Sequence, residues 1–261
     1  MALQADDILN TKIESLITSE VYEKNKNFIN IIFTPTSQYY DQSHLDVVKI
    51  VETLKENGLL KLFYDKPKQI TLSFSSSGTP LYFVKIMGDT LRAMGYYRYI
   101  TKESTLDKTG FTWSISLKSE YATDPLLLKK QLNKRGCDIV DLERIDAYNW
   151  HYQIDMNNAH LNLKSLTNGK SVHFKRSLYA HWLDVSKTKQ IVVTSLRGNN
   201  WFPYIAYYDK SMRLLKVYKR DQKTWEITLN IPRDTMYVKV SDMYTLKNIK
   251  DGLKITAKGK R

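Results

Sequence analysis

Residues 81–118 combine a helical stripe, a glycine and two extended stretches, and this order limits the fold more than any other part of the chain. Apolar residues from Leu81 to Leu91 recur at the spacing of a helix and not of a strand. Gly95 follows them and is the expected helix stop. Apolar and polar residues then alternate over 111–118, which gives a returning strand one apolar face. The stretch therefore predicts one helix that covers one hairpin.

Two more stretches have the same order. Apolar stripes at 47–54 and 126–132 end at Gly58 and Gly136, and each glycine is followed by two extended runs. Residues 65–67, which end at Pro67, are the expected turn between the two runs after Gly58. The three helix-ending glycines are spaced by roughly 40 residues, a period that indicates a structural repeat. A unit this short cannot bury its own apolar face, so neighbouring units must share a core or a sheet. The alternative is an ordinary α+β domain in which the spacing is a coincidence.

From residue 160 onwards the pattern changes to short apolar alternations between turn residues. About eight such runs follow one another at nearly even spacing, which is typical of a β-sandwich. Asn168 and Gly169 lie between two of the runs and predict a hairpin turn. The sequence thus predicts an α+β chain in which helix-strand-strand repeats precede an all-β, jelly-roll-like sandwich. The expected parts are an N-terminal helix at 1–27, a region of about three helix-hairpin units at 28–156 that opens with a buried strand at 28–33, and the sandwich domain at 157–261.

The net charge is +13, but only ten of the 40 basic residues are arginines. Lysines are more typical of solvated surfaces than of bidentate contacts to phosphates. They are spread along the chain and are dense only at 129–135, 216–220 and 254–261. A generic basic surface is favoured over a dedicated nucleic-acid site, because such a site is usually clustered on one face. An acidic or polyanionic partner remains an alternative.

No pattern of catalytic residues is present in the sequence. None of the five histidines has the spacing of a zinc motif, and no G-x-S-x-G sequence occurs. Cys137 is the single cysteine, so a disulfide within the chain is excluded and a core position is expected. No apolar stretch approaches the roughly 18 residues that a membrane helix needs. We expect a protein that is not an enzyme and that uses no cofactor and no metal.

The segment LRAMGYYRYI, followed by FTWSISL, resembles polypeptide-transport-associated (POTRA) domains and related α/β modules of the bacterial envelope. The resemblance covers residues 91–117 and implies a scaffold outside the inner membrane that binds protein partners along a strand edge. It departs from the family in having room for one helix per unit, whereas those domains usually carry two. We also expect tyrosine-rich loops to contact a partner, through Tyr39, Tyr40, Tyr97 and Tyr99.

The order IVVTS, a Gly-Asn turn, YIAYYDKSMRLLKVY and WEITLNIPRDTMYVKVSD is similar to accessory β-sandwich modules of the carbohydrate-binding and pre-peptidase types. The similarity covers residues 185–245 and implies binding without chemistry. Rings that stack on sugars and planar polar groups that read hydroxyls occur in two adjacent loops of this region. The alternative is that the tryptophans fill the sandwich core and the asparagines form a turn. The candidate ligand-binding residues are Trp182, Trp201, Tyr204, His181, Arg197, Asn199 and Asn200.

These patterns lead to one main functional prediction and two alternatives. The main prediction is a non-catalytic binding or scaffold protein of the bacterial cell envelope that engages a protein partner. The alternatives are glycan binding through the aromatic loops and nucleic-acid binding through the lysine-rich surface. Residues 1–7 lack the basic start and the apolar run of a signal peptide. We expect a periplasmic or secreted protein whose signal has been removed, with a cytoplasmic location as the alternative.

Overall fold

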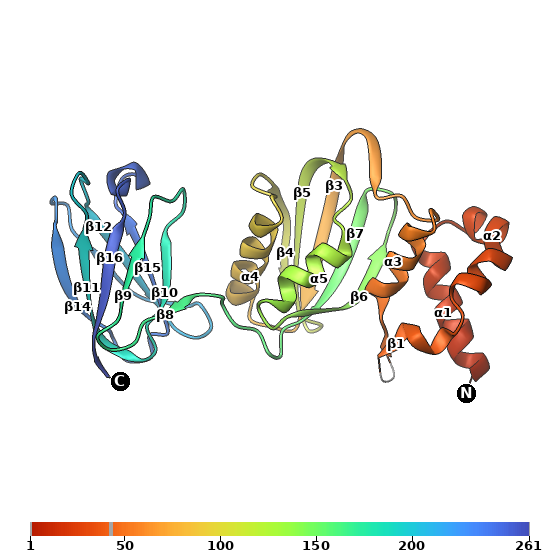
Figure 1. Cartoon of the computed structure of the whole chain (residues 1–261), viewed down its shortest axis with the longest axis horizontal. Coiled ribbons are helices and arrows are strands. Elements are labelled where there is room, and N and C mark those ends of the chain that lie inside the picture. The colour runs from red at the N-terminus through yellow and green to blue at the C-terminus, as the bar shows by residue number, and fades with distance from the viewer. Residues whose placement is uncertain (1, 42–43, 261) are drawn as a thin grey trace. The chain divides into compact units, whose positions relative to one another are not determined.

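The structure is a computed structural model that describes residues 2–41 and 44–260, and it divides into two compact units (Figure 1). The first unit ends at Leu161 and the second begins at Asn162. All five α-helices described lie in the first unit, whereas the second consists mostly of strands. The expected α+β class is therefore confirmed.

The first unit opens with helices. The side chain of Thr18 accepts a hydrogen bond from the Val21 amide and caps the second helix. This helix includes residues 28–32 of the apolar run and ends there, so the expectation of a strand at 28–33 is wrong. Ile29 is buried but Ile31 is 72% exposed, as expected for a helix with one face on the core. The elements are α1 (Ala2–Leu16), α2 (Ser19–Ile32), η1 (Thr36–Tyr39), β1 (Tyr40–Asp41), β2 (His44–Leu45) and α3 (Val47–Glu56).

A five-stranded sheet follows, in the order β4-β5-β3-β7-β6. All neighbours are antiparallel except β3 and β7. Apolar residues of alternate positions, such as Phe74 and Trp113, are buried against the helices that lie on one face (Figure 1). The elements are β3 (Phe63–Ser76), α4 (Pro80–Ala93), β4 (Ile100–Leu106), β5 (Phe111–Tyr121), α5 (Pro125–Asn133), β6 (Asp138–Arg144) and β7 (Asn149–Asp155).

Two of the three expected helix-hairpin units are formed, and the first is not. The helices α4 and α5 are each followed by a hairpin, β4–β5 and β6–β7. After α3, however, residues 63–76 form one continuous strand instead of a hairpin that turns at 65–67. The pairing of β3 with β5 is irregular between Phe63 and Lys68, and this irregularity accommodates Pro67, which has no N–H for a ladder.

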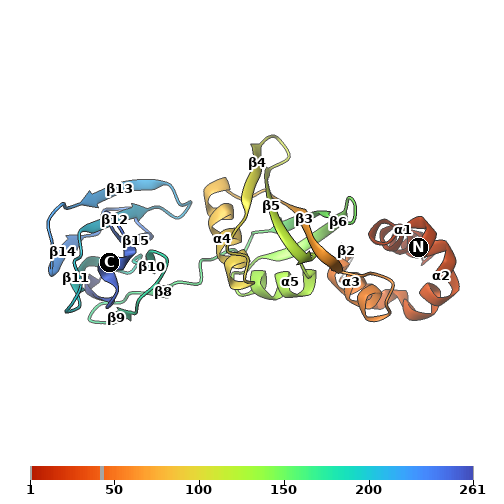
Figure 2. The same ribbon diagram turned by 90° about the horizontal axis from the view of Figure 1, so that it is seen from above.

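The second unit contains two sheets. One has the order β13-β12-β15-β10-β8 and the other the order β14-β11-β16-β9. Side chains from both sheets, including Ile205 and Ile255, form one hydrophobic core. Figure 2 shows the two layers from above. The strands are β8 (Lys164–Ser165), β9 (Ser171–Phe174), β10 (His181–Asp184), β11 (Thr188–Ser195), β12 (Pro203–Tyr208), β13 (Leu214–Lys219), β14 (Glu226–Asn230), β15 (Tyr237–Asp242) and β16 (Leu253–Lys260), with η2 (Leu246–Ile249) before the last.

The hairpin predicted at Asn168 and Gly169 is not formed. The strands on either side of this turn, β8 and β9, belong to different sheets, where β8 pairs with β10 and β9 pairs with β16. Gly169 still has the positive φ of 77° that an Asn-Gly turn requires. The local turn was therefore predicted correctly and its strand pairing was not.

Candidate ligand-binding site

Three of the predicted ligand-binding residues, Trp201, Asn199 and His181, are buried in the second unit. Trp201 is 0% exposed, and its indole Nε1 donates a hydrogen bond to the Ser241 carbonyl oxygen at 2.9 Å. Asn199 is 1% exposed, and its side-chain amide donates to the Gly252 carbonyl oxygen at 2.7 Å. Trp201 fills the core and Asn199 fastens two loops, so neither presents a surface to a ligand.

His181 and Trp182 are neighbours on β10 and point to opposite faces of their sheet. The His181 ring is buried 4.5 Å from the Phe174 ring, and this burial lowers the pKa of its imidazole. Trp182 lies on the outer face, with its ring centroid 5.0 Å from that of Tyr208 and the Lys239 ammonium 5.9 Å away. Only the second of these two residues is directed away from the core.

The remaining three predicted residues lie at the surface of the second unit. Tyr204 is half-buried on β12, and the Lys219 ammonium is 5.5 Å from its ring centroid. Arg197 and Asn200 are exposed in the connection between β11 and β12. The structure thus separates the predicted set into core residues and surface residues.

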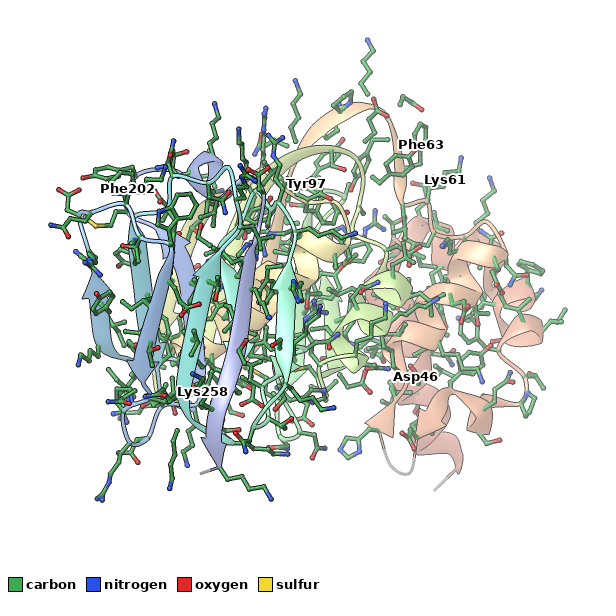
Figure 3. All side chains as sticks on the ribbon, turned by 60° about the vertical axis from the view of Figure 1, so that its left-hand side comes forward. Asp46, Lys61, Phe63, Tyr97, Phe202 and Lys258 are labelled. Atoms are coloured by element: carbon green, nitrogen blue, oxygen red, sulfur yellow. The ribbon has the colours of Figure 1, made fainter. Side chains whose placement is uncertain are left out.

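The four tyrosines predicted to contact a partner differ in how far they are exposed to solvent. Tyr39 is 2% exposed, and its hydroxyl donates a hydrogen bond to the Ile32 carbonyl oxygen at 3.1 Å. Tyr40 is half-buried on β1, and Tyr99 lies edge-on to the Trp113 ring at 5.7 Å. Tyr97 is 65% exposed and is labelled in Figure 3. It is the one member of this group with most of its ring in solvent.

A basic and aromatic surface includes the connection between β13 and β14, and of its members the sequence pointed only to Tyr204 and to the basic residues at 216–220. Trp225 is 52% exposed, and the Lys223 ammonium lies 4.8 Å from its ring centroid. Tyr244 is 61% exposed, and its hydroxyl donates a short hydrogen bond to the Asp221 carboxylate. This bond raises the pKa of the Tyr244 phenol. We call this surface the basic–aromatic cluster, and it consists of Tyr204, Lys219, Arg220, Asp221, Lys223, Trp225 and Tyr244.

The basic–aromatic cluster is held by backbone hydrogen bonds to the sheets. The Arg220 amide donates to the Pro203 carbonyl oxygen at 3.0 Å, and the Thr224 amide donates to that of Trp201 at 2.9 Å. The Trp225 carbonyl oxygen accepts from the Ser195 amide at 2.7 Å. Residues 220–225 are therefore fixed at both ends, and Phe202 beside them marks this end of the unit in Figure 3. The sequence signals for the surface are the basic density at 216–220 and the predicted ligand-binding residue Tyr204.

The net positive charge of the chain comes entirely from the second unit. Residues 162–261 contain 21 of the 40 lysines and arginines but only 7 of the 27 acidic residues, so their formal charge is +14. Residues 1–161 contain the other 19 basic and 20 acidic residues, for a charge of −1. The electrostatic field of the second unit is therefore positive, whereas the first unit is nearly neutral.

In the first unit, helix α1 lies along the β6 side of the sheet. The Lys12 ammonium donates to the Leu142 carbonyl oxygen at 3.1 Å and pairs with Asp141 at 2.6 Å. Arg144 donates from its guanidinium to the Leu16 carbonyl oxygen at 2.9 Å. A partly apolar cavity of about 700 Å³ lies between these elements, lined by residues such as Ile8. At the opposite side of the sheet every residue of β4 is exposed (Figure 2).

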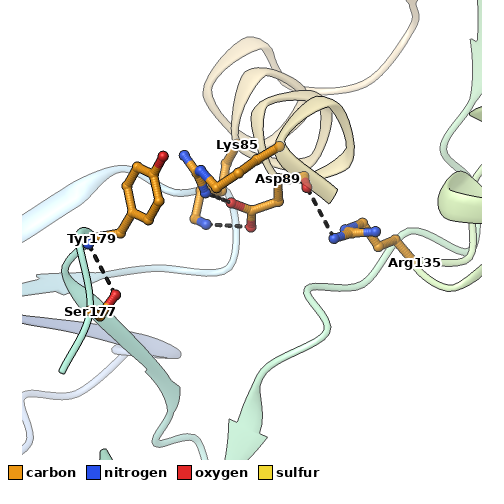
Figure 4. A network of polar contacts seen from close by, with 6 residues as sticks. Lys85, Asp89, Arg135, Ser177 and Tyr179 are labelled. Carbon is orange, nitrogen blue, oxygen red and sulfur yellow. Dashed lines mark hydrogen bonds and ion pairs between the residues drawn. The ribbon is translucent and has the colours of Figure 1, made fainter. Parts of the chain in front are cut away.

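A polar network holds α4 to the segment after α5 (Figure 4). The Asp89 carboxylate accepts from the Lys85 ammonium at 2.5 Å and from the Arg92 guanidinium at 2.9 Å. The Arg135 guanidinium donates to the Asp89 backbone carbonyl at 3.3 Å. Burial lowers the pKa of the Lys85 ammonium. Since its charges are already paired with one another, we assign this network a structural role.

A serine, a histidine and a glutamate lie in a row on the sheet face opposite α4 and α5. His151 Nε2 is 2.9 Å from Ser75 Oγ, and its Nδ1 is 3.7 Å from the Glu143 carboxylate. Acyl transfer also needs donors that converge on an oxyanion. Ser75 lies in β3, which pairs with a strand on each side, so the amides around it point along the sheet. No group of metal-ligating side chains occurs within 2–41 and 44–260.

None of the helices described is long and apolar enough to cross a bilayer.

Comparison with known proteins provides no family assignment. No protein-family model matches the chain, and a search of curated proteins finds no matching relative.

Proposed function

We propose that the chain is a non-catalytic binding protein of the bacterial cell envelope and that its second unit attaches to an anionic polymer. The observation that carries this proposal is the division of charge, +14 in residues 162–261 against −1 in residues 1–161. Cations that neutralise a polymer release its counterions, which favours association at low salt. The periplasmic or secreted location rests on the resemblance of residues 91–117 and 185–245 to envelope and secreted modules.

The strand order of the second unit supports a jelly-roll assignment. Strands β9 to β16 divide into the sheets β9-β16-β11-β14 and β10-β15-β12-β13, with β8 added at one edge. Eight strands in two such sheets are typical of jelly rolls, an architecture that includes lectin domains. Binding of a glycan chain is therefore favoured over nucleic-acid binding as the role of this unit.

The proposal is tested by retention of the full chain on an immobilised anionic polysaccharide and on neutral dextran, over a series of salt concentrations. We expect retention on the anionic polymer alone and a steady loss with salt. A triple variant Lys210→Glu, Lys216→Glu, Lys219→Glu in the second unit should abolish it. The matched variant Lys24→Glu, Lys102→Glu, Lys108→Glu changes the charge of the first unit equally and should bind as the native chain does. Equal loss in both variants, or no retention of the native chain, would contradict the proposal.

A second candidate function is capture of a protein strand by β4. Its supporting observation is the contrast between the two sides of the five-stranded sheet, where α1 lies on β6 and all seven residues of β4 are exposed. An extended peptide can add to such an edge through main-chain hydrogen bonds. A photo-crosslinking residue at Lys102 should then give one defined adduct in cells, and the same residue at Lys12 should give none. Identical adduct patterns at both positions would exclude capture by β4.

A further inference from the structure

We infer that the basic–aromatic cluster is a sugar-binding subsite for an acidic glycan that carries carboxylate groups, such as a polyuronate. This inference rests on the proposed function, because it names the ligand and the residues of the anionic-polymer surface. Its starting point is a contrast within the second unit. Trp201 is fully buried, whereas Trp225 leaves 52% and Tyr244 leaves 61% of its surface in solvent.

The exposed rings provide flat apolar surfaces. A pyranose presents a face of C–H groups that stacks on an aromatic ring, and tryptophan and tyrosine also keep a polar group at the ring edge. Trp225 ends a segment, 220–225, that backbone hydrogen bonds hold against β11 and the start of β12, and Tyr244 is hydrogen-bonded to Asp221 of the same segment. A ligand therefore meets rings that are already placed, which reduces the ordering cost of binding.

The cations beside these rings select a negatively charged ligand. The Lys223 ammonium lies 4.8 Å from the Trp225 ring centroid, and the Lys219 ammonium lies 5.5 Å from that of Tyr204. A sugar that stacks on either ring brings its substituents next to an ammonium group. A carboxylate on that sugar gains an ion pair with the ammonium in addition to a hydrogen bond, whereas a neutral sugar gains only the hydrogen bond.

The acidic member of the cluster favours a glycan over a nucleic acid. Asp221 accepts a hydrogen bond from the Tyr244 hydroxyl and has acceptor capacity left on its carboxylate. Sugar hydroxyls are donors that can use this capacity. The phosphodiester backbone of DNA has no free hydroxyl groups along its length that could donate to the Asp221 carboxylate. Rings, ammonium groups and one carboxylate together match a polymer that carries both acids and hydroxyls.

The experiment measures binding of the full chain to an oligogalacturonate, to the neutral galactose oligomer of equal length, and to single-stranded oligothymidine. We expect the oligogalacturonate to bind at least about 10-fold more tightly than either of the others. Trp225→Ala should weaken this binding about 10-fold, since it removes the ring on which the sugar stacks. Tyr97→Ala removes an exposed ring of the first unit and should leave this binding unchanged. Urea unfolding of both variants verifies that they fold.

Three outcomes would overturn the inference: tighter binding of oligothymidine, equal binding of the neutral oligomer, or unchanged binding by the folded Trp225→Ala variant. Its failure can be separated from failure of the proposed function. If Trp225→Ala binds normally but the second-unit charge reversal still abolishes retention, only the sugar subsite is wrong. If neither variant changes retention, both proposals are wrong.

Discussion

The Trp201 indole and the Ser241 carbonyl oxygen are joined by a 2.9 Å hydrogen bond inside the second unit, where the ring is fully buried. The bond fastens the start of β12 to the end of β15, next to the segment that carries the basic–aromatic cluster. Trp201 is thus the internal support of a surface whose outward ring is Trp225.

Replacement of Trp201 by alanine should destabilise the protein strongly. The variant loses a large buried ring, leaves a cavity and leaves the Ser241 carbonyl oxygen without its donor. We expect the free energy of unfolding, from urea titration, to fall by about 3–5 kcal/mol. Trp225→Ala, at an exposed position of the same unit, should lower it by less than about 1 kcal/mol. Similar losses in the two variants would show that Trp201 is not a core residue.

The buried His181 should make stability depend on pH. Burial lowers the pKa of this imidazole in the folded state below the ordinary value of 6.5, so the unfolded chain binds the proton more readily. Stability is then complete above about pH 6.5 and decreases as the pH falls below that value. Unfolding midpoints measured from pH 7.5 to pH 5 should decline for the native chain and decline less for His181→Phe. His173→Gln, at an exposed position, should retain the native dependence.

Gly136 should tolerate alanine much less well than Gly58. Both have a positive φ, 66° and 72°, so alanine is strained at either site by about 1–2 kcal/mol. At Gly136 a Cβ would also lie 2.0 Å from the Asn158 carbonyl oxygen, whereas at Gly58 no atom lies within 4 Å. We expect Gly58→Ala to cost about 1 kcal/mol and Gly136→Ala about 3 kcal/mol or more in thermal or urea unfolding. Equal losses of stability in the two variants would show that the Asn158 carbonyl oxygen does not lie this close to Gly136.

The thiol of Cys137 should be unreactive in the folded protein. It is 2% exposed, and burial together with the nearby Asp155 carboxylate raises its pKa to about 11. At pH 8 almost no thiolate is present, and the thiolate is the form that is alkylated. Iodoacetamide should therefore modify the chain at a low rate in buffer and rapidly in urea. Fast modification of the folded chain would contradict the burial of this residue.

Lys12 should hold α1 against the sheet. Lys12→Met keeps most of the apolar stem but removes the ion pair to Asp141 and the hydrogen bond to the Leu142 carbonyl oxygen. Amides of α1 should then exchange with deuterium about 10-fold faster, because the helix opens without global unfolding. Lys26→Met removes a surface ion pair within α2 and should leave this exchange unchanged.

The sequence was most informative where a single residue sets the local backbone. Gly58, Gly95 and Gly136 all follow helices and all have a positive φ, as their spacing predicts. The sequence was least informative where pairing between distant segments decides whether residues form a strand or a turn. Pro67 suggested a turn, but β5 offers a partner along most of residues 63–76, and the irregularity near the proline preserves one strand. The run at 28–33 belongs to a helix because its start, capped by Thr18, lies further upstream.

The candidate site was harder to predict than the fold. Trp201 and Trp225 both precede a strand and both follow a polar residue, and these shared features do not distinguish the buried ring from the exposed one. Whether each ring is buried depends on how strands that are distant in the sequence come together in the two sheets, and this is a property of the whole unit. The basic density at 216–220 was visible in the sequence, whereas the contact of Asp221 with Tyr244 joins residues from separate connections.

The position of α1 has a consequence for self-association. A strand edge invites pairing with a second copy, and repeated pairing at two open edges produces a fibre. Here α1 of the same chain lies along the β6 edge of the five-stranded sheet, so a second copy could pair only with the β4 edge. Two copies that joined through β4 would form a ten-stranded sheet with α1 at each end, and association by that route would stop at a dimer.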